Sequence, residues 1–354
     1  MEEPTPVSKS PSKIKPDRVP PKSTALFRSL LAKKEFGIFA LLVGLCVLTG
    51  LKNPRFFSQA NLTNTANLIG LYGVFSLGLG LVIITGGIDL SVGSMCALTG
   101  VILAMGVTEW HWSWPVATFV VLGISMLLGL MHGLLITRAK LQPFIVTLCG
   151  LLIYRGVARF IADDGTKGFA GAEGIEPLRQ LASGKLFGLP APFAILIFLA
   201  VVMWFVLHRS IYGRYLLAVG RNEQAARFSG INTRLVITSA YVMAALFTGV
   251  SGIMIAFYTN SVSPSNHGNF YELYGIAAAV LGGCSLRGGE GSVVGIVIGT
   301  ALLLVLQNLV NLLTLFGKPI PSSLNFAVMG AVVLFGVLAD QLFKNRSAKR
   351  GAAA

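Results

Sequence analysis

Residues Gly86–Ser94 carry the polar groups most able to do chemistry within a long apolar stretch of the chain. The segment reads GGIDLSVGS and lies between two apolar runs, Ala66–Thr85 and Met95–Val107. An ionised aspartate at membrane depth costs roughly 2.5–3.5 kcal/mol on insertion scales unless it is paired or solvated. Glycines let a spanning helix break where protein or a water-filled cavity covers the backbone. We therefore predict a hinge and a helix start here, formed by Gly86, Gly87, Asp89, Ser91 and Gly93.

Asp89 is the charged residue of this segment, and its carboxylate allows two interpretations. Either it pairs with a basic or amide group that moves during a functional cycle, or it caps the helix that starts near Ser91. Acidic side chains stabilise the amino ends of helices by about 0.3–1 kcal/mol. We favour the capping role, in which Asp89 need not touch a substrate.

The composition is that of an integral membrane protein. Of 354 residues, 54% are hydrophobic and only 12% are charged, against about 25% charged residues in soluble domains. The net charge of +14 comes from basic residues that flank apolar spans, which is the positive-inside pattern of membrane proteins. We therefore expect no nucleic-acid partner.

Apolar segments recur along the chain at close to the length of about 20 residues that spans a bilayer core. They predict an all-α polytopic membrane protein with about ten transmembrane segments, some of them broken helices. The eighth segment is too short to cross alone and is predicted to be one of these. The segments are Phe36–Leu51, Ala66–Thr85, Leu90–Val107, Pro115–Ile136, Pro143–Ala162, Pro192–Leu207, Leu235–Phe257, Leu273–Gly283, Ser292–Leu315 and Leu324–Phe343.

The two ends of the chain differ in composition from this transmembrane domain, which covers residues 36–343. Residues 1–35 are rich in Pro, Lys and Ser and bury too little apolar surface to offset the entropy of ordering, so we predict a disordered tail. Basic residues in this tail and in residues 344–354 place both termini in the cytoplasm, which ten crossings allow.

A second glycine-rich break resembles the first. The run AAAVLGG ends at Gly282 and Gly283 and leads to Gly291-Ser292 and another apolar helix, as LGLVIITGG leads to Gly93-Ser94. Both runs cross the membrane in the same direction under this topology. The pattern predicts a parallel internal repeat.

The sequence contains no known catalytic signature. It has no GxxxxGK[ST] phosphate loop, no HExxH and no GxSxG, and its four histidines are scattered. We therefore predict that the chain is not an enzyme and holds no metal. Asp89 and Glu272, each placed at a predicted span boundary, form a poor ion relay. Transport driven by ATP would then need a separate ATPase subunit.

One inner connection, GRNEQAARFSGI, has the pattern of a short surface helix. Asn222 is a suitable N-cap, Glu223, Ala225 and Ala226 favour the first turn, and Gly230 ends the helix. Such a helix, near 222–230 and with small exposed residues, suits the docking of a soluble partner. An ordinary interfacial loop helix fits the same pattern.

A few polar residues lie inside predicted spans. Gln307, Asn308 and Asn311 cluster at helical spacing, and Arg155 lies well inside its span. The three amides either line a pathway or make interhelical hydrogen bonds, and the second use is the commoner one for amides. Arg155 either snorkels outward or lines the pathway. We favour a packed or interfacial role for Arg155. We expect His132 to be a packing residue bonded to a carbonyl.

Four ordered motifs resemble the permease subunits of the ribose-type family of carbohydrate ABC importers, which includes ribose, xylose, galactoside and autoinducer-2 permeases. The resemblance covers roughly Phe36 to Leu342. It departs from the family at Tyr274-Gly275, where Asp-Ala is more common. The matching motifs are GGIDLSVG from Gly86, PFIVTL from Pro143, GRNEQAARFSGI from Gly220, and IAAAVLGG from Ile276 followed by GGEGS from Gly288.

The resemblance implies a permease that forms the pathway for a monosaccharide in the bacterial cytoplasmic (inner) membrane. A periplasmic or lipid-anchored sugar-binding protein would deliver the substrate. ATP-Mg would be bound by partner ATPase subunits that dock on the coupling helix Asn222–Gly230, and this chain would hold no cofactor. A second permease copy, identical or paralogous, would complete the pathway.

Two alternatives stay open at this point. The first is a related ABC permease for branched-chain amino acids or nucleosides. The second is a stand-alone secondary carrier.

Overall fold

The computed structural model describes residues 34–312, the strands at 314–315 and 318–319, and the single positions 324, 327, 330, 331 and 334. Apart from residues 34–35, the predicted tail 1–35 lies outside this part of the chain. So does the tail 344–354, together with most of the tenth segment, Leu324–Phe343. Those predictions stand as made.

The described residues are mostly helical, which confirms the all-α polytopic fold class. Seven helices are long and apolar enough to span a membrane, and two apolar helices are shorter. The long ones are α2 (Lys34–Lys52), α3 (Gln59–Ile84), α5 (Trp114–Thr137), α6 (Pro143–Ile161), α8 (Ala191–Arg209), α11 (Thr233–Thr259) and α13 (Val293–Leu312). The shorter ones are α4 (Val92–Thr108) and α12 (Tyr271–Leu281).

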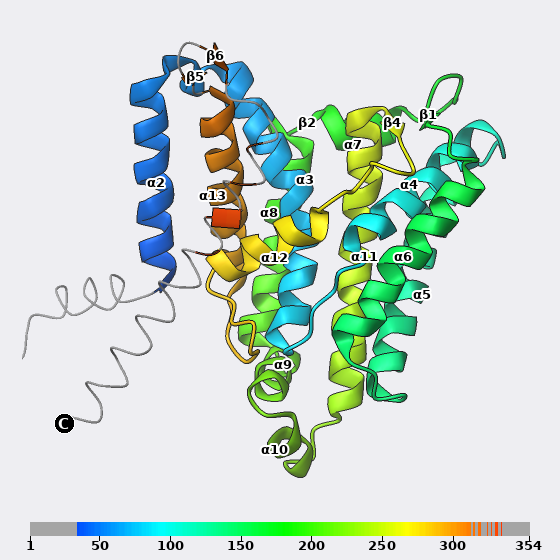
Figure 1. The fold of residues 1–354 in the computed structure, drawn as a ribbon, viewed down its shortest axis with the longest axis vertical. Coiled ribbons are helices and arrows are strands. Elements are labelled where there is room, and N and C mark those ends of the chain that lie inside the picture. The colour runs from blue at the N-terminus through cyan, green and yellow to red at the C-terminus, as the bar shows by residue number, and fades with distance from the viewer. Residues whose placement is uncertain are drawn as a thin grey trace, which may run out of the picture.

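The connections carry small elements at the two ends of the bundle. Their helices are η1 (Pro54–Phe57), α7 (Glu176–Ser183), α9 (Ile211–Arg221) and α10 (Glu223–Phe228). Their two-residue strands are β1 (Lys167–Gly168), β2 (Lys185–Leu186), β3 (Leu189–Pro190), β4 (Ser261–Val262), β5 (Thr314–Leu315) and β6 (Lys318–Pro319). The strands pair antiparallel as β1 with β4, β2 with β3 and β5 with β6. Helices α9 and α10 lie together at one end, called the α10 end below (Figure 1).

Helices α3 and α11 form the centre of the bundle. Within the most apolar 18 residues of each helix, 83% of the residues of α3 and 78% of those of α11 are buried. The corresponding share is 6% in α2, which lies at the edge of the bundle (Figure 1). Helix α11 packs along α3 and α5, and the Ser251 hydroxyl donates a hydrogen bond to the Leu71 carbonyl. The remaining helices pack around these two central helices.

Helix α3 begins seven residues before the predicted segment Ala66–Thr85. The Ser58 hydroxyl accepts a hydrogen bond from the Asn61 amide and so caps the helix at this earlier point. Polar residues in the first turns lower the local hydropathy, which is why a count of apolar residues misses them. Two of them, Asn61 and Thr65, bond Asn308 of α13.

Both central helices are followed by a segment that turns back into the bundle before a short helix begins (Figure 1). After α3 the chain re-enters from the α10 end, and α4 starts at Val92. After α11 it re-enters from the opposite end, and α12 starts at Tyr271. With 11 residues, α12 is too short to span a core that needs about 20, so the predicted broken helix is confirmed.

The two glycine-rich breaks join helices of different lengths. The first connects the 26-residue α3 to the 17-residue α4. The second connects the 11-residue α12 to the 20-residue α13. The parallel internal repeat stays a prediction.

Candidate functional site

The amino ends of the two short helices meet inside the bundle. A Cβ atom added to Gly93 would lie 1.9 Å from the Gly268 carbonyl oxygen, and one added to Gly268 would lie 2.0 Å from the Gly93 oxygen. Gly268 also has φ +75°, a conformation that glycine adopts without steric cost. The two backbones therefore touch at a point where no larger residue fits.

Glu272 lies at this contact, in the first turn of α12. Its carboxylate lies against the start of α4, since a Cβ atom added to Gly93 would lie 2.7 Å from Glu272 Oε2, and the side chain is buried. Helix amino ends carry a partial positive charge of about half an elementary charge. The carboxylate therefore lies beside the positive ends of both short helices. The sequence placed Glu272 at an outer boundary, which was wrong, because the segment before α12 enters the bundle.

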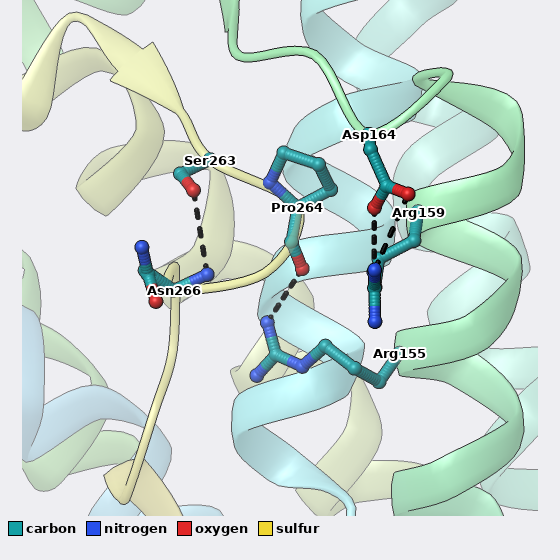
Figure 2. Close-up of polar contacts among 6 residues, drawn as sticks. All are labelled: Arg155, Arg159, Asp164, Ser263, Pro264 and Asn266. Carbon is teal, nitrogen blue, oxygen red and sulfur yellow. Dashed lines mark hydrogen bonds and ion pairs between the residues drawn. The ribbon is translucent and has the colours of Figure 1, made fainter.

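Arg155 of α6 supports the segment that leads into α12. Its Nη1 atom donates hydrogen bonds to the carbonyl oxygens of Pro264 at 2.9 Å and His267 at 2.6 Å. Figure 2 shows the guanidinium directed at Pro264. These carbonyls belong to non-helical backbone, so Arg155 supplies donors that a helix would otherwise provide. Whether Arg155 also lines a pathway stays a prediction.

A second arginine of α6 forms an exposed ion pair near the end of the helix. Arg159 Nε lies 2.5 Å from Asp164 Oδ1 (Figure 2). Its hydrogen bond and positive charge hold the pKa of the Asp164 carboxyl below its ordinary value. Both side chains are more than half exposed, and solvent screens such pairs strongly. Arg159 is therefore a useful contrast to Arg155, which lies one helical turn away.

Asp89 fixes the turn before α4. Its side chain is 1% exposed, and Oδ1 accepts hydrogen bonds from the Ser91 amide at 2.8 Å and the Ser91 hydroxyl at 2.7 Å. The N-cap residue of α4 is Ser91, which makes no side-chain capping bond. The predicted helix start is confirmed, but Asp89 binds the N-cap residue instead of amides inside the helix. The expected capping role is corrected accordingly.

Helices α6 and α11 hold the same turn. The Ile88 carbonyl accepts hydrogen bonds from the Tyr241 hydroxyl of α11 at 3.2 Å and from the Thr147 hydroxyl of α6 at 3.4 Å. Nearby, His132 Nε2 of α5 and the Tyr154 hydroxyl of α6 are 2.7 Å apart. His132 is thus bonded to a tyrosine, and the carbonyl partner expected from the sequence was wrong.

The hinge residues of the two breaks follow the ends of α3 and α12. Gly86 and Gly283 have φ +84° and +89°. Gly87 lies against the Tyr241 side chain, since an added Cβ would be 2.5 Å from the hydroxyl. Gly282 lies against the α13 backbone, where an added Cβ would be 2.4 Å from the Gly295 oxygen. Movement at these glycines stays a prediction.

The amides of α13 connect it to neighbouring helices. Asn308 Nδ2 donates to Asn61 Oδ1 at 2.8 Å and to Thr65 Oγ1 at 2.7 Å, both on α3. Gln307 lies near the hydroxyl of Tyr274 on α12, and Asn311 is exposed at the last turn. Asn308 therefore makes the interhelical bonds that the sequence offered as the commoner use. A lining role for the three amides stays a prediction.

An aromatic cluster lies beside the start of α12. It joins the ring of Tyr271 to Phe75 in a stacked contact at 5.7 Å and to Tyr72 at 5.1 Å. Tyr274 packs edge-on to Tyr72 at 5.3 Å. No local pattern predicted this cluster, because its rings come from α3 and α12, which are far apart in the chain.

Helix α10 confirms the predicted surface helix. Asn222 Oδ1 accepts the Ala225 amide at 2.9 Å, and Gly230 follows the helix with φ +84°. Glu223 accepts a hydrogen bond from the Thr233 hydroxyl at 3.1 Å, which joins α10 to α11. Ala225 is exposed, but Ala226 is only 5% exposed, so its expected exposure was wrong.

Phe228 is the residue of α10 that the sequence reasoning missed. Its side chain is 91% exposed at the last position of the helix. A phenylalanine in that position exposes a large apolar surface to solvent. Exposed aromatic residues of this kind are common anchors in protein interfaces.

Replacing Arg155 with alanine should destabilise the protein, because two backbone carbonyls of the segment before α12 lose their donor. A buried acceptor left without a partner costs about 1–3 kcal/mol. We expect a melting temperature several degrees lower in detergent, measured by intrinsic fluorescence. The melting temperature of Arg155→Lys should lie between those of the wild type and Arg155→Ala, since an ammonium group lacks the planar fork of a guanidinium.

Arg159→Ala is the matched control on the same helix and should leave the melting temperature unchanged. Equal melting temperatures for Arg155→Ala and Arg159→Ala would contradict the supporting role of Arg155.

Comparison with known proteins places the chain among transport permeases. A family model described as "Branched-chain amino acid transport system / permease component" matches residues 61–337. The ribose import permease protein of Escherichia coli (strain K12) is 34% identical over 307 residues, covering 87% of this chain and 93% of that protein.

Two further relatives have similar identity. The ribose import permease protein of Bacillus subtilis (strain 168) is 35% identical over 320 residues, covering 87% of this chain and 93% of that protein. The galactofuranose transporter permease protein of Escherichia coli (strain K12) is 34% identical over 285 residues, covering 80% of each. No solved structure matches the chain. With its multi-pass helical fold and these matches, the chain belongs to the permease-component family described by that model.

Proposed function

We propose that this protein is the membrane-spanning subunit of an ATP-driven importer and forms the pathway for a ribose-like pentose or hexose. The observation that carries the proposal is the meeting of α4 and α12, amino end to amino end, inside the bundle. Non-helical backbone at membrane depth is tolerated only against protein or a water-filled cavity. Transporters place their substrate sites at such discontinuous helices.

The segment before α12 provides polar side chains at this position. Ser265, Asn266 and Asn269 are exposed, although the segment runs into the bundle. Hydroxyl and amide groups of this kind exchange hydrogen bonds with a polyol. Weak contacts are sufficient for a substrate that a binding protein has already selected.

The substrate class rests on the relatives. Both of the sugars named above, ribose and galactofuranose, are monosaccharides. The family description names branched-chain amino acids, and a permease for these or for nucleosides is the alternative. A stand-alone secondary carrier is less well supported, because Glu272 and Asp89 are buried at helix starts inside the bundle.

The remaining partners follow from the same proposal. ATPase subunits that hold ATP-Mg would dock on α10, so this chain would have no catalytic role and no cofactor of its own. A periplasmic or lipid-anchored binding protein would deliver the sugar at the opposite end. A second permease copy, identical or paralogous, would complete the pathway in the bacterial inner membrane, with both termini of each chain in the cytoplasm.

Phe228→Ala should weaken docking of the ATPase, because it removes the large exposed apolar group of α10. We expect at least about a tenfold loss of affinity, the size of a typical aromatic anchor. The measurement is titration of the purified cognate ATPase onto the permease in nanodiscs. Phe187→Ala, at a fully exposed loop position between β2 and β3, is the control and should bind as the wild type does.

The substrate proposal is tested on the cognate binding protein. We expect calorimetric titration to show tight binding of a pentose or hexose and no binding of leucine, valine or nucleosides. Uptake of that sugar by cells should stop when the partner ATPase gene is deleted. Tight binding of an amino acid would contradict the sugar assignment, and uptake that persists without the ATPase would contradict the importer itself.

A further inference from the structure

The α10 end contains a junction that connects the docking helix to both broken segments. Helices α9 and α10 are separated only by Asn222, whose side chain caps α10. The last turn of α9 therefore directly precedes α10, with no loop between them. That turn contains Gly220 and Arg221.

Gly220 lies against two other backbones. A Cβ atom added to Gly220 would lie 1.8 Å from the Ile84 carbonyl oxygen and 2.4 Å from the Gly289 nitrogen. These two groups are themselves joined, since the Gly289 amide donates to the Ile84 oxygen at 2.8 Å. Any side chain at position 220 would push apart the end of α3 and the α12–α13 connection.

The glycines of the α12–α13 connection lie equally close to the last turn of α9 and to the end of α3. A Cβ atom on Gly288 would lie 2.7 Å from the Gly220 oxygen and 2.8 Å from the Gly86 nitrogen. A Cβ atom on Gly289 would lie 2.4 Å from Arg221 Cγ. We call this three-way contact the glycine joint. It consists of residues 84–86, 220–221 and 288–289.

Two arms of the joint lead to the two short helices. From residues 84–86 the chain continues through the Asp89 turn to the start of α4. From residues 288–289 it leads back through the connection to α12, whose start contacts Gly93 of α4. The third arm is α9, and through it α10. The docking helix is thus connected, through α9 and the joint, to both elements that meet inside the bundle.

We propose that Gly220 is a positioning residue that transmits displacement between α10 and the pair of short helices through the glycine joint. This inference rests on the proposed importer function. It assigns no contact with sugar or nucleotide to Gly220. Close packing makes the joint move as one unit, because interlocked backbones resist gradual deformation. Thermodynamic coupling is reciprocal, so a binding protein on the outer face should alter ATP hydrolysis at the α10 end through this joint.

The test uses the complete complex of permease, cognate ATPase and binding protein in nanodiscs. The readout is the ATP hydrolysis rate with and without the binding protein, using ribose as the probe sugar. Gly220→Ala should keep the basal rate and co-purification with the ATPase. Its stimulation by the binding protein should fall by at least about fivefold, the lower end of typical coupling factors.

Gly123→Ala is the matched control. It adds the same methyl group to a helical glycine of α5 that has no neighbouring atom within 4 Å, so its stimulation should equal that of the wild type. Normal stimulation in Gly220→Ala would overturn the proposal. Parallel loss of the basal rate and of ATPase binding would also overturn it, because the substitution would then act on docking. A wild-type complex that the binding protein does not stimulate would instead contradict the importer function.

If Gly220→Ala does not assemble with the ATPase, a double-cysteine variant tests the same proposal. Arg221→Cys and Arg287→Cys place two thiols at exposed positions, one in the joint and one directly before its arm at residues 288–289, in a background in which Cys46 and Cys149 are serine. A short bismaleimide across the joint should leave stimulation unchanged, since both residues would move together. Loss of stimulation after cross-linking would overturn the proposal.

Discussion

Non-helical backbone inside a membrane bundle has polar groups that lipid cannot satisfy, and this constraint governs the rest of the structure. In the part of the chain that the structure describes, one such segment lies before α4 and another before α12. Arg155 donates to the carbonyls of Pro264 and His267 in the second. Asp89 accepts from Ser91 in the first. Each interaction replaces a bond that a continuous helix would have made within itself.

The surrounding helices can be understood from the same constraint. Helices α3 and α11 are buried along most of their length, because each broken segment must be covered by protein. Tyr241 and Thr147 reach the Ile88 carbonyl from α11 and α6. The Glu272 carboxylate lies between two helix amino ends, where the partial charges of both favour it. Non-helical backbone in the bundle therefore destabilises the fold only where its polar groups have no partner.

Local features of the sequence predicted much of this arrangement. The break at Gly86–Ser91 and the start of α10 at Asn222 each depend on residues within one helical turn, and both were predicted. The polar first turns of α3 were missed, because their partner Asn308 lies on α13. Glu272 and Ala226 were misplaced for the same reason, since their burial is decided by α4 and by the fold around α10. Contacts between distant segments leave no periodic signal in a single sequence.

The central claim is that a polar pathway passes the point where α4 and α12 meet. The most direct measurement is the reaction of Asn269→Cys with a membrane-impermeant charged thiol reagent, in a background in which Cys46 and Cys149 are serine. Leu152→Cys is the matched comparison, an exposed apolar position on α6. The account predicts that the thiol at position 269 reacts in intact membranes and the one at position 152 does not. An inert thiol at position 269, with and without the binding protein and ATP, would contradict it.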